Sequence, residues 1–137
     1  MVSPPDANPG APGPGDRGPG RASSLLTSFR YAFAGLGYVV RTQRNFRIQL
    51  AAGGLAVILA AWLHFSPLEG AVLAGTITLV LTLEMVNTVV EAAVDLASPT
   101  YHPLAKIAKD VAAGAVLLTA LGALGVGACL FLPHLGR

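Results

Sequence analysis

The feature that most constrains this chain is a stretch near its C-terminus, residues 111–132, that contains no charged residue. About 20 consecutive apolar residues in a helix cross the hydrocarbon core of a bilayer, which is about 30 Å thick. Further apolar stretches run over 67–96 and 48–65. Charged residues make up 12% of the chain, about half the share in a soluble domain. The sequence therefore predicts an all-α membrane protein rather than a soluble domain.

Proline and capping residues indicate where these helices begin and end. The Ser-Pro-Leu-Glu segment at 66–69 has the pattern of a capping box with proline at the first helical position. Ser98-Pro99 should end that helix, His102-Pro103 should open the next, and Pro133 should end it. The predicted spans are about 48–65, 67–96 and 103–132.

Two segments precede the first span. Residues 1–22 are dominated by proline, glycine and small polar residues, and they predict a disordered tail. From about 24 to 45 the pattern is that of an amphipathic helix, with Arg30 and Arg41 outside its apolar face. Such a helix is expected to lie on an anionic membrane surface. Its apolar face comprises Leu25, Leu26, Phe29, Phe33, Leu36 and Val40.

The distribution of basic residues predicts the orientation of the spans. Most of them precede residue 48, and Lys106 and Lys109 follow the second span, whereas the short turn at 64–69 contains neither lysine nor arginine. Because basic loops stay on the cytoplasmic side, the N-terminus is expected to be cytoplasmic.

The second span carries polar side chains on one side, which we call the acidic face. It consists of Glu84, Asn87, Thr88, Glu91 and Asp95, whose spacing places them within an arc of about 100°. A charged residue at the bilayer centre costs about 2.5–3.5 kcal/mol on insertion scales. Glu84 lies about 26 Å along the helix from Pro67, just inside the predicted cytoplasmic boundary. A carboxyl group at that depth predicts a functional site.

The third span opens with Lys106, Lys109 and Asp110 at the same expected depth. Carboxylates can hold Mg²⁺ against substrate phosphates, a lysine can neutralise a transferred phosphoryl group, and a carboxylate can accept the proton of a hydroxyl. This combination suits phosphoryl transfer to a membrane alcohol, although the chain has no Walker A motif. An ion or proton pathway, or a non-enzymatic membrane subunit using Glu84, fits the residues equally well. The residues alone leave these classes open.

Four segments resemble the prokaryotic diacylglycerol kinase / undecaprenol kinase family. They are SFRYAFAGL at 28–36, RNFRIQLA at 44–51, EMVNTVVEAAVDL at 84–96 and HPLAKIAKDVAAGAVLL at 102–118. The resemblance implies a homotrimer of three-span protomers in the bacterial inner membrane, whose sites form between neighbouring subunits. It also implies ATP with Mg²⁺ and a lipid alcohol acceptor. The SFRYAF and NFRIQL segments favour undecaprenol, with diacylglycerol as the alternative, and no nucleic-acid partner is expected.

The resemblance also implies roles for the acidic face. Glu84 resembles the family's proposed general base, Asn87 its neighbouring amide, and Glu91 the glutamate that binds the cation accompanying ATP. The family's second metal-binding glutamate is replaced here by Gln43. An amide oxygen supplies no charge, so weaker metal binding is expected.

The same resemblance implies a nucleotide site at the start of the third span. The positions that match it are Asp95, Lys109, Asp110, Tyr101, His102 and Arg47. Lys109 is expected to contact phosphate, while Tyr101 and His102 resemble the loop near the adenine. Arg47 matches a family arginine to which no role is assigned.

Overall fold

The computed structural model describes residues 25–136. They form four α-helices, and no strand occurs among them: α1 (Leu25–Thr42), α2 (Arg44–Trp62), α3 (Pro67–Ala97) and α4 (Pro103–Leu135). The chain divides into two units inside α1, between Ala34 and Gly35, and the second unit contains α2, α3 and α4. The predicted tail at 1–22 lies outside the described residues.

The predicted amphipathic segment is a helix, but it ends earlier than expected. α1 stops at Thr42, whose hydroxyl donates a hydrogen bond to the Tyr38 carbonyl oxygen at 2.9 Å. Gln43 is extended, with φ −97° and ψ 110°, and it is the N-cap of α2, which begins at Arg44 rather than near 48. One extended residue thus separates two helices where the sequence predicted a single helix to about 45. The membrane-surface location of α1 stays a prediction.

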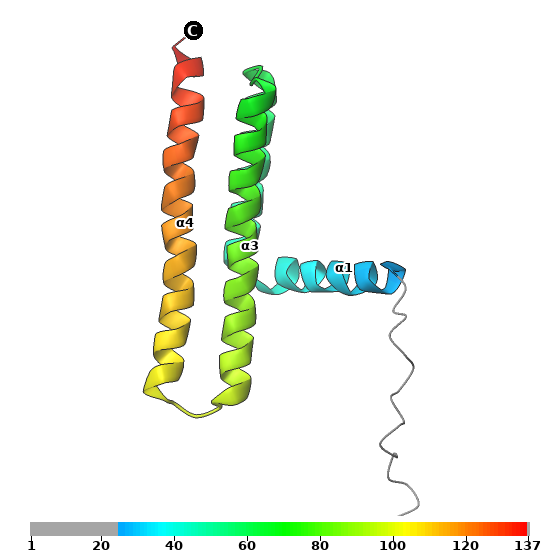
Figure 1. Cartoon of the computed structure of the whole chain (residues 1–137), viewed down its shortest axis with the longest axis vertical. Coiled ribbons are helices and arrows are strands. Elements are labelled where there is room, and N and C mark those ends of the chain that lie inside the picture. Colours follow the sequence, from blue (N-terminus) through cyan, green and yellow to red (C-terminus); the bar gives the residue numbers. More distant parts are fainter. Residues whose placement is uncertain (1–24, 137) are drawn as a thin grey trace, which may run out of the picture. The chain divides into compact units, whose positions relative to one another are not determined.

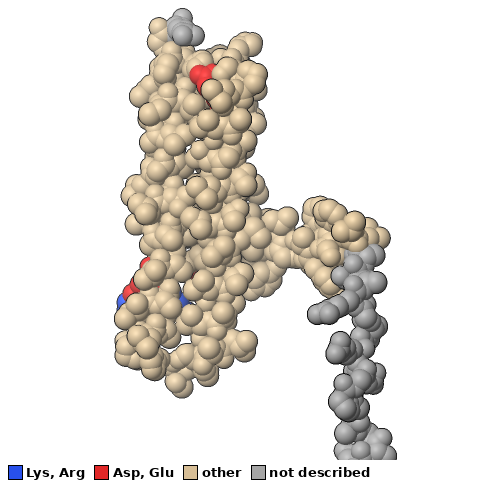
Figure 2. Space-filling model, in the orientation of Figure 1, with Lys and Arg blue, Asp and Glu red and all other residues tan. Residues whose placement is uncertain are grey.

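The three predicted spans are confirmed as helices long and apolar enough to cross a membrane. α2 has 19 residues, α3 has 31 and α4 has 33, which at about 1.5 Å per residue gives lengths of about 28, 46 and 50 Å. α3 and α4 therefore exceed a hydrocarbon core of about 30 Å. They run antiparallel, with α2 behind α3 in Figure 1. Charged atoms on the face in Figure 2 lie toward the ends of these helices.

The predicted helix starts are confirmed by their capping contacts. The Ser66 hydroxyl accepts from the Glu69 backbone N–H at 3.3 Å, and Glu69 Oε2 accepts from the Ser66 N–H at 2.7 Å. At α4, the His102 ring accepts from the Leu104 N–H at 3.2 Å. These contacts satisfy backbone donors that a helix start leaves free.

The expectation that Pro133 ends the last helix was wrong. α4 includes Pro133 and continues to Leu135. A proline so close to the C-terminal end removes one hydrogen bond from a turn that is already ending, so its penalty is smaller than in a helix interior. His134 also anchors this turn, because its ring stacks on Phe65 with centroids 4.7 Å apart and its Nδ1 lies 3.0 Å from the Leu130 oxygen.

Gly53 of α2 packs closely against Ile77 of α3, and this contact allows a prediction. A Cβ atom at Gly53 would lie 2.9 Å from Cγ2 of Ile77, whereas a Cβ at Gly54 would have no atom within 4 Å. We expect Gly53→Ala to destabilise the fold by about 1–3 kcal/mol through overpacking, and Gly54→Ala to leave it nearly unchanged. Denaturant unfolding in detergent micelles measures both variants. Equal stabilities would contradict this packing.

Few side chains of the described chain are buried. The buried apolar residues are Val39, Phe46, Ala60 and Leu73, and the buried polar residues are Glu84 and Thr88. Many large apolar side chains on α2, α3 and α4 are exposed, as expected for helices whose outer surfaces meet lipid. Glu84 is a charged residue buried among helices whose side chains are mostly exposed, and its burial indicates a candidate functional site.

Candidate active site

Glu84 lies on α3 with its side chain turned into the helix bundle. Only 2% of the residue is exposed. Gln49 reaches it from α2, and its Nε2 donates to Glu84 Oε2 at 3.4 Å. One turn further along, the Thr88 hydroxyl donates to the Glu84 backbone carbonyl at 3.0 Å. The packing of α2 on α3 thus encloses the Glu84 carboxylate, while its role in a functional site stays a prediction.

Gln49 is a functional candidate that the sequence analysis missed. Its Nε2 contacts Glu84, while its Oε1 is buried with no hydrogen-bond partner in the described part of the chain. The available signal was an amide in the otherwise apolar sequence of 48–62. Buried polar atoms are nearly always paired, so an unpaired Oε1 beside a carboxylate points to a partner outside this chain.

Asn87 and Glu91 form a second amide–carboxylate pair on the acidic face. Asn87 Nδ2 donates to Glu91 Oε1 at 3.1 Å, and Asn87 Oδ1 is buried without a partner within residues 25–136. A carboxylate can only accept hydrogen bonds, so each amide must present its NH₂ group to it. Both Asn87 and Gln49 therefore keep a free carbonyl oxygen, a hard ligand of the kind that Mg²⁺ prefers.

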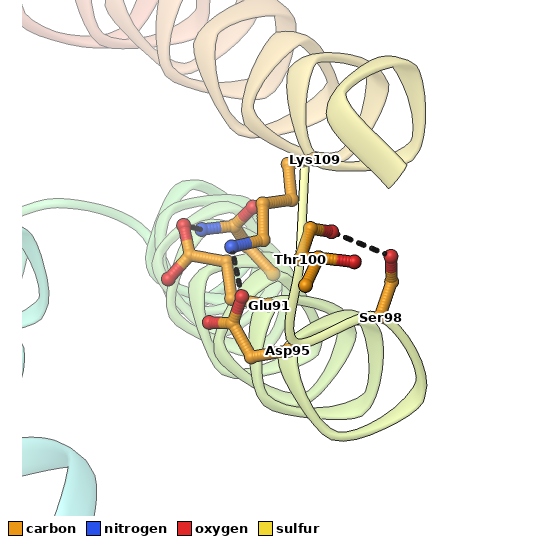
Figure 3. Close-up of polar contacts among 6 residues, drawn as sticks. Glu91, Asp95, Ser98, Thr100 and Lys109 are labelled. Atoms are coloured by element: carbon orange, nitrogen blue, oxygen red, sulfur yellow. Dashed lines mark hydrogen bonds and ion pairs between the residues drawn. The ribbon is translucent and has the colours of Figure 1, made fainter. Parts of the chain in front are cut away.

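Lys109 of α4 lies at the exposed end of the acidic face, beside Asp95. It reaches from α4 and forms an ion pair with Asp95, near the side of α3 that carries Glu91 (Figure 3). The Lys109 side chain is 37% exposed. Asp110 is not part of this group, because its ion-pair partner is Lys106, one turn earlier on α4. Lys109 therefore forms its ion pair with a residue of α3, whereas Lys106 forms its ion pair within α4.

The remaining predicted residues lie outside this group. Tyr101 and His102 are exposed in the segment before α4, where His102 serves as a cap. Arg47 is exposed on α2, and the Gln43 side chain makes no capping hydrogen bond. Within residues 25–136, no three His, Cys, Asp or Glu side chains gather closely enough to hold a metal.

The carboxylates of the acidic face become more exposed toward the C-terminal end of α3. Glu84 is buried, Glu91 is half-buried and Asp95 is exposed, and about 16 Å of helix separates the first from the last. Such a row can bind a charged, hydrated group at its exposed end and a weakly polar one at its buried end. Residues 30–131, which contain the whole row, match the sequence profile of prokaryotic diacylglycerol kinases.

The chain belongs to the prokaryotic diacylglycerol kinase family. It is 54% identical over 115 residues to a diacylglycerol kinase of Synechocystis, covering 83% of this chain and 66% of that protein. It is 39% identical over 111 residues to an undecaprenol kinase of Bacillus subtilis, covering 81% and 90%. For a diacylglycerol kinase of Escherichia coli the identity is 32% over 112 residues, covering 82% and 92%.

Membership of the prokaryotic diacylglycerol kinase family confirms the resemblance found in the sequence. It identifies the chain as a lipid kinase and favours the enzyme over the ion pathway and the non-enzymatic subunit. The relatives differ in the acceptor that their names give, so family membership leaves the acceptor to be argued from the site.

Proposed function

We propose that this protein transfers the γ-phosphoryl group of ATP to the hydroxyl group of a membrane lipid alcohol, with undecaprenol as the favoured acceptor and diacylglycerol as the alternative. The observation that carries the proposal is the buried Glu84 carboxylate at the inner end of the acidic face. Its depth in α3 suits an acceptor whose hydroxyl lies at the membrane interface.

Glu84 is the general base in this proposal. The acceptor hydroxyl oxygen attacks the γ-phosphorus, and its proton passes to the Glu84 carboxylate. The bond between the γ-phosphorus and the oxygen that bridges it to the β-phosphate breaks, and ADP leaves with that electron pair. The Gln49 amide holds one carboxylate oxygen at 3.4 Å, which leaves the other available for the hydroxyl proton.

Glu91 and Asn87 would hold the Mg²⁺ that accompanies ATP. A carboxylate and the free Asn87 Oδ1 are oxygen ligands one helical turn apart, and Mg²⁺ usually takes one or two carboxylates together with substrate phosphates. The bound cation would neutralise charge on the β- and γ-phosphates. Lys109, already positioned by Asp95, would place its ammonium group against the same phosphates.

The exposed nucleotide residues support assembly of the site from more than one subunit. Asp110, Tyr101, His102 and Arg47 are exposed in the single chain, and no three His, Cys, Asp or Glu side chains of the described residues gather closely enough to hold a metal. We propose a homotrimer in the bacterial inner membrane, with the N-terminus cytoplasmic, in which a neighbouring subunit completes the nucleotide site.

A direct assay separates the two acceptors. Purified protein in mixed micelles is incubated with radiolabelled ATP, Mg²⁺ and either undecaprenol or diacylglycerol, and the extracted lipid is counted. We expect label in both lipids, with a higher kcat/KM for undecaprenol. A higher kcat/KM for diacylglycerol would reverse the acceptor assignment, and no label in either lipid would overturn the proposed function.

The metal assignment predicts opposite shifts for two substitutions. Glu91→Gln removes a charged ligand and should raise the half-saturating Mg²⁺ concentration roughly tenfold or more. Gln43→Glu adds the carboxylate that the wild-type chain lacks at this position and should lower that concentration. Steady-state rates across a Mg²⁺ titration at saturating ATP measure both shifts. An unchanged titration for Gln43→Glu would remove this residue from the metal site.

A further inference from the structure

Gln49 lies on the side of α2 that packs against α3. Phe46, Gln49 and Gly53 have the spacing that places residues on one face of a helix. Phe46 and Gly53 are both buried, and a Cβ atom at Gly53 would lie 2.9 Å from Cγ2 of Ile77 on α3. Close packing on either side of Gln49 therefore fixes where its side chain starts relative to α3.

The Glu84 carboxylate depends on Gln49 for its orientation. Among residues 25–136, the hydrogen bond from Gln49 Nε2 is the one that the carboxylate oxygens accept. The Thr88 hydroxyl bonds to the Glu84 backbone oxygen and so leaves the carboxylate free to rotate. A glutamate side chain loses much rotamer freedom when it is ordered. Without the Gln49 contact, the buried carboxylate would sample several orientations.

We infer that Gln49 is a positioning residue for the proposed base, because its amide holds Glu84 Oε2 and so presents Oε1 to the acceptor hydroxyl. The inference rests on the proposed function and adds a residue of α2 on which the rate of the chemical step depends. In this role Gln49 acts through Glu84 and not on a substrate. A misplacement of about 1 Å in a reacting group can cost about 10²-fold in rate.

The chemistry of an amide suits this position. A carboxylate only accepts hydrogen bonds, so the side chain that holds it must be a donor. A lysine or arginine would donate but would bring a charge into the segment 48–62, which contains no charged residue, and burying a charge costs far more than burying an amide. Gln49 Nε2 donates to Glu84 without adding a charge.

Gln49→Met tests the inference, because it keeps the length of the side chain and removes the donor. We expect kcat to fall about 10–10²-fold, while KM for ATP, KM for the acceptor and the half-saturating Mg²⁺ concentration stay within about twofold of wild type. Lipid phosphorylation in mixed micelles, over ranges of ATP, Mg²⁺ and undecaprenol, measures all four. An unchanged kcat would overturn the inference, as would a higher KM for the acceptor at unchanged kcat, which would place Gln49 on the substrate.

Two further variants separate positioning from a general effect on the fold. Gln49→Asn retains an amide but withdraws it from Glu84 by one methylene, so its kcat should also fall while the mass of the protein–detergent complex is unchanged. Thr76→Val is the matched control, because it removes a polar group of α3 whose hydroxyl bonds to the Val72 carbonyl oxygen of the same helix at 2.8 Å. Its kcat should stay within about twofold of wild type. A fall in kcat as large in Thr76→Val as in Gln49→Asn would overturn the inference.

Combining Gln49→Met with Glu84→Gln shows whether Gln49 acts through the base. Residues that act as a unit are strongly non-additive, so Gln49→Met should lower the residual rate of Glu84→Gln protein less than about twofold. A further fall of tenfold or more would give Gln49 a role independent of Glu84 and overturn the inference.

The same measurements keep this inference distinct from the proposed function. The proposed function fails if wild-type protein labels no lipid, or if Glu84→Gln protein keeps the wild-type rate. The inference alone fails if Glu84→Gln protein loses its rate and Gln49→Met protein keeps it.

Discussion

Glu84→Gln is expected to lower kcat by about 10²–10⁴-fold, the usual contribution of a general base. The substitution keeps the size of the side chain and its hydrogen-bond acceptor for Gln49, whose Nε2 donates to the carboxylate. It removes the carboxylate that is proposed to take the hydroxyl proton. Assembly and ATP binding should therefore persist while turnover is lost, as measured by lipid phosphorylation, nucleotide binding and the mass of the complex.

The same helix offers a matched control. Glu69→Gln makes the same chemical change in the first turn of α3, where the side chain accepts a hydrogen bond from the Ser66 N–H. Glutamine can take this place in a capping box, so lipid phosphorylation should stay close to the wild-type rate. Glu84→Gln protein that turns over like Glu69→Gln would remove Glu84 from the chemistry.

The architecture could be predicted because its signals are local. An uncharged stretch such as 111–132 predicts a membrane helix wherever it occurs, and the capping residues of 66–69 mark a helix start through contacts within four residues. The helix boundaries were less certain. Gln43 interrupts the helical backbone between α1 and α2 although it is neither proline nor glycine. Pro133 is accommodated in the last turn of α4.

The candidate site was only partly predictable, because some of its contacts join residues that are far apart in the sequence. The acidic face follows from helical periodicity within α3, so the sequence alone groups Glu84, Asn87, Glu91 and Asp95 on one side of the helix. The Gln49–Glu84 contact depends on the register of α2 against α3, across 35 positions of sequence. No local pattern encodes that register, and a single amide in an apolar span does not identify its partner.

The ion-pair partners of Lys106 and Lys109 are a further feature that the sequence did not predict. Lys106 and Lys109 are equivalent in a helical pattern, three positions apart at the start of one span. The structure gives Lys106 a partner on its own helix, Asp110, and gives Lys109 a partner on α3, Asp95. Because exposed i,i+4 ion pairs on a helix contribute only about 0.3–0.5 kcal/mol, the Lys106 pair is a local surface contact.

Lys109→Met is therefore expected to lower kcat by about 10²–10³-fold, the usual cost of removing one group that stabilises charge in a transition state. The substitution retains the length of the side chain and removes its ammonium group. Glu91 and Asp95 would then face the phosphates without a neighbouring cation, so KM for ATP should rise as well. Initial rates over a range of ATP concentrations, at saturating Mg²⁺ and lipid, separate the two effects.

Lys106→Met is the matched control, since it removes the same charge one turn away and disturbs only the pair with Asp110. Its kcat and KM for ATP should remain within about twofold of wild type, as for most changes at exposed ion pairs. Asp95→Asn separates phosphate contact from ion pairing, because it frees Lys109 without removing its charge and should lower kcat much less than Lys109→Met. If Lys106→Met and Lys109→Met were equally mild, both lysines would serve only to anchor α4 at the membrane surface, and the phosphate contact would have to come from another residue.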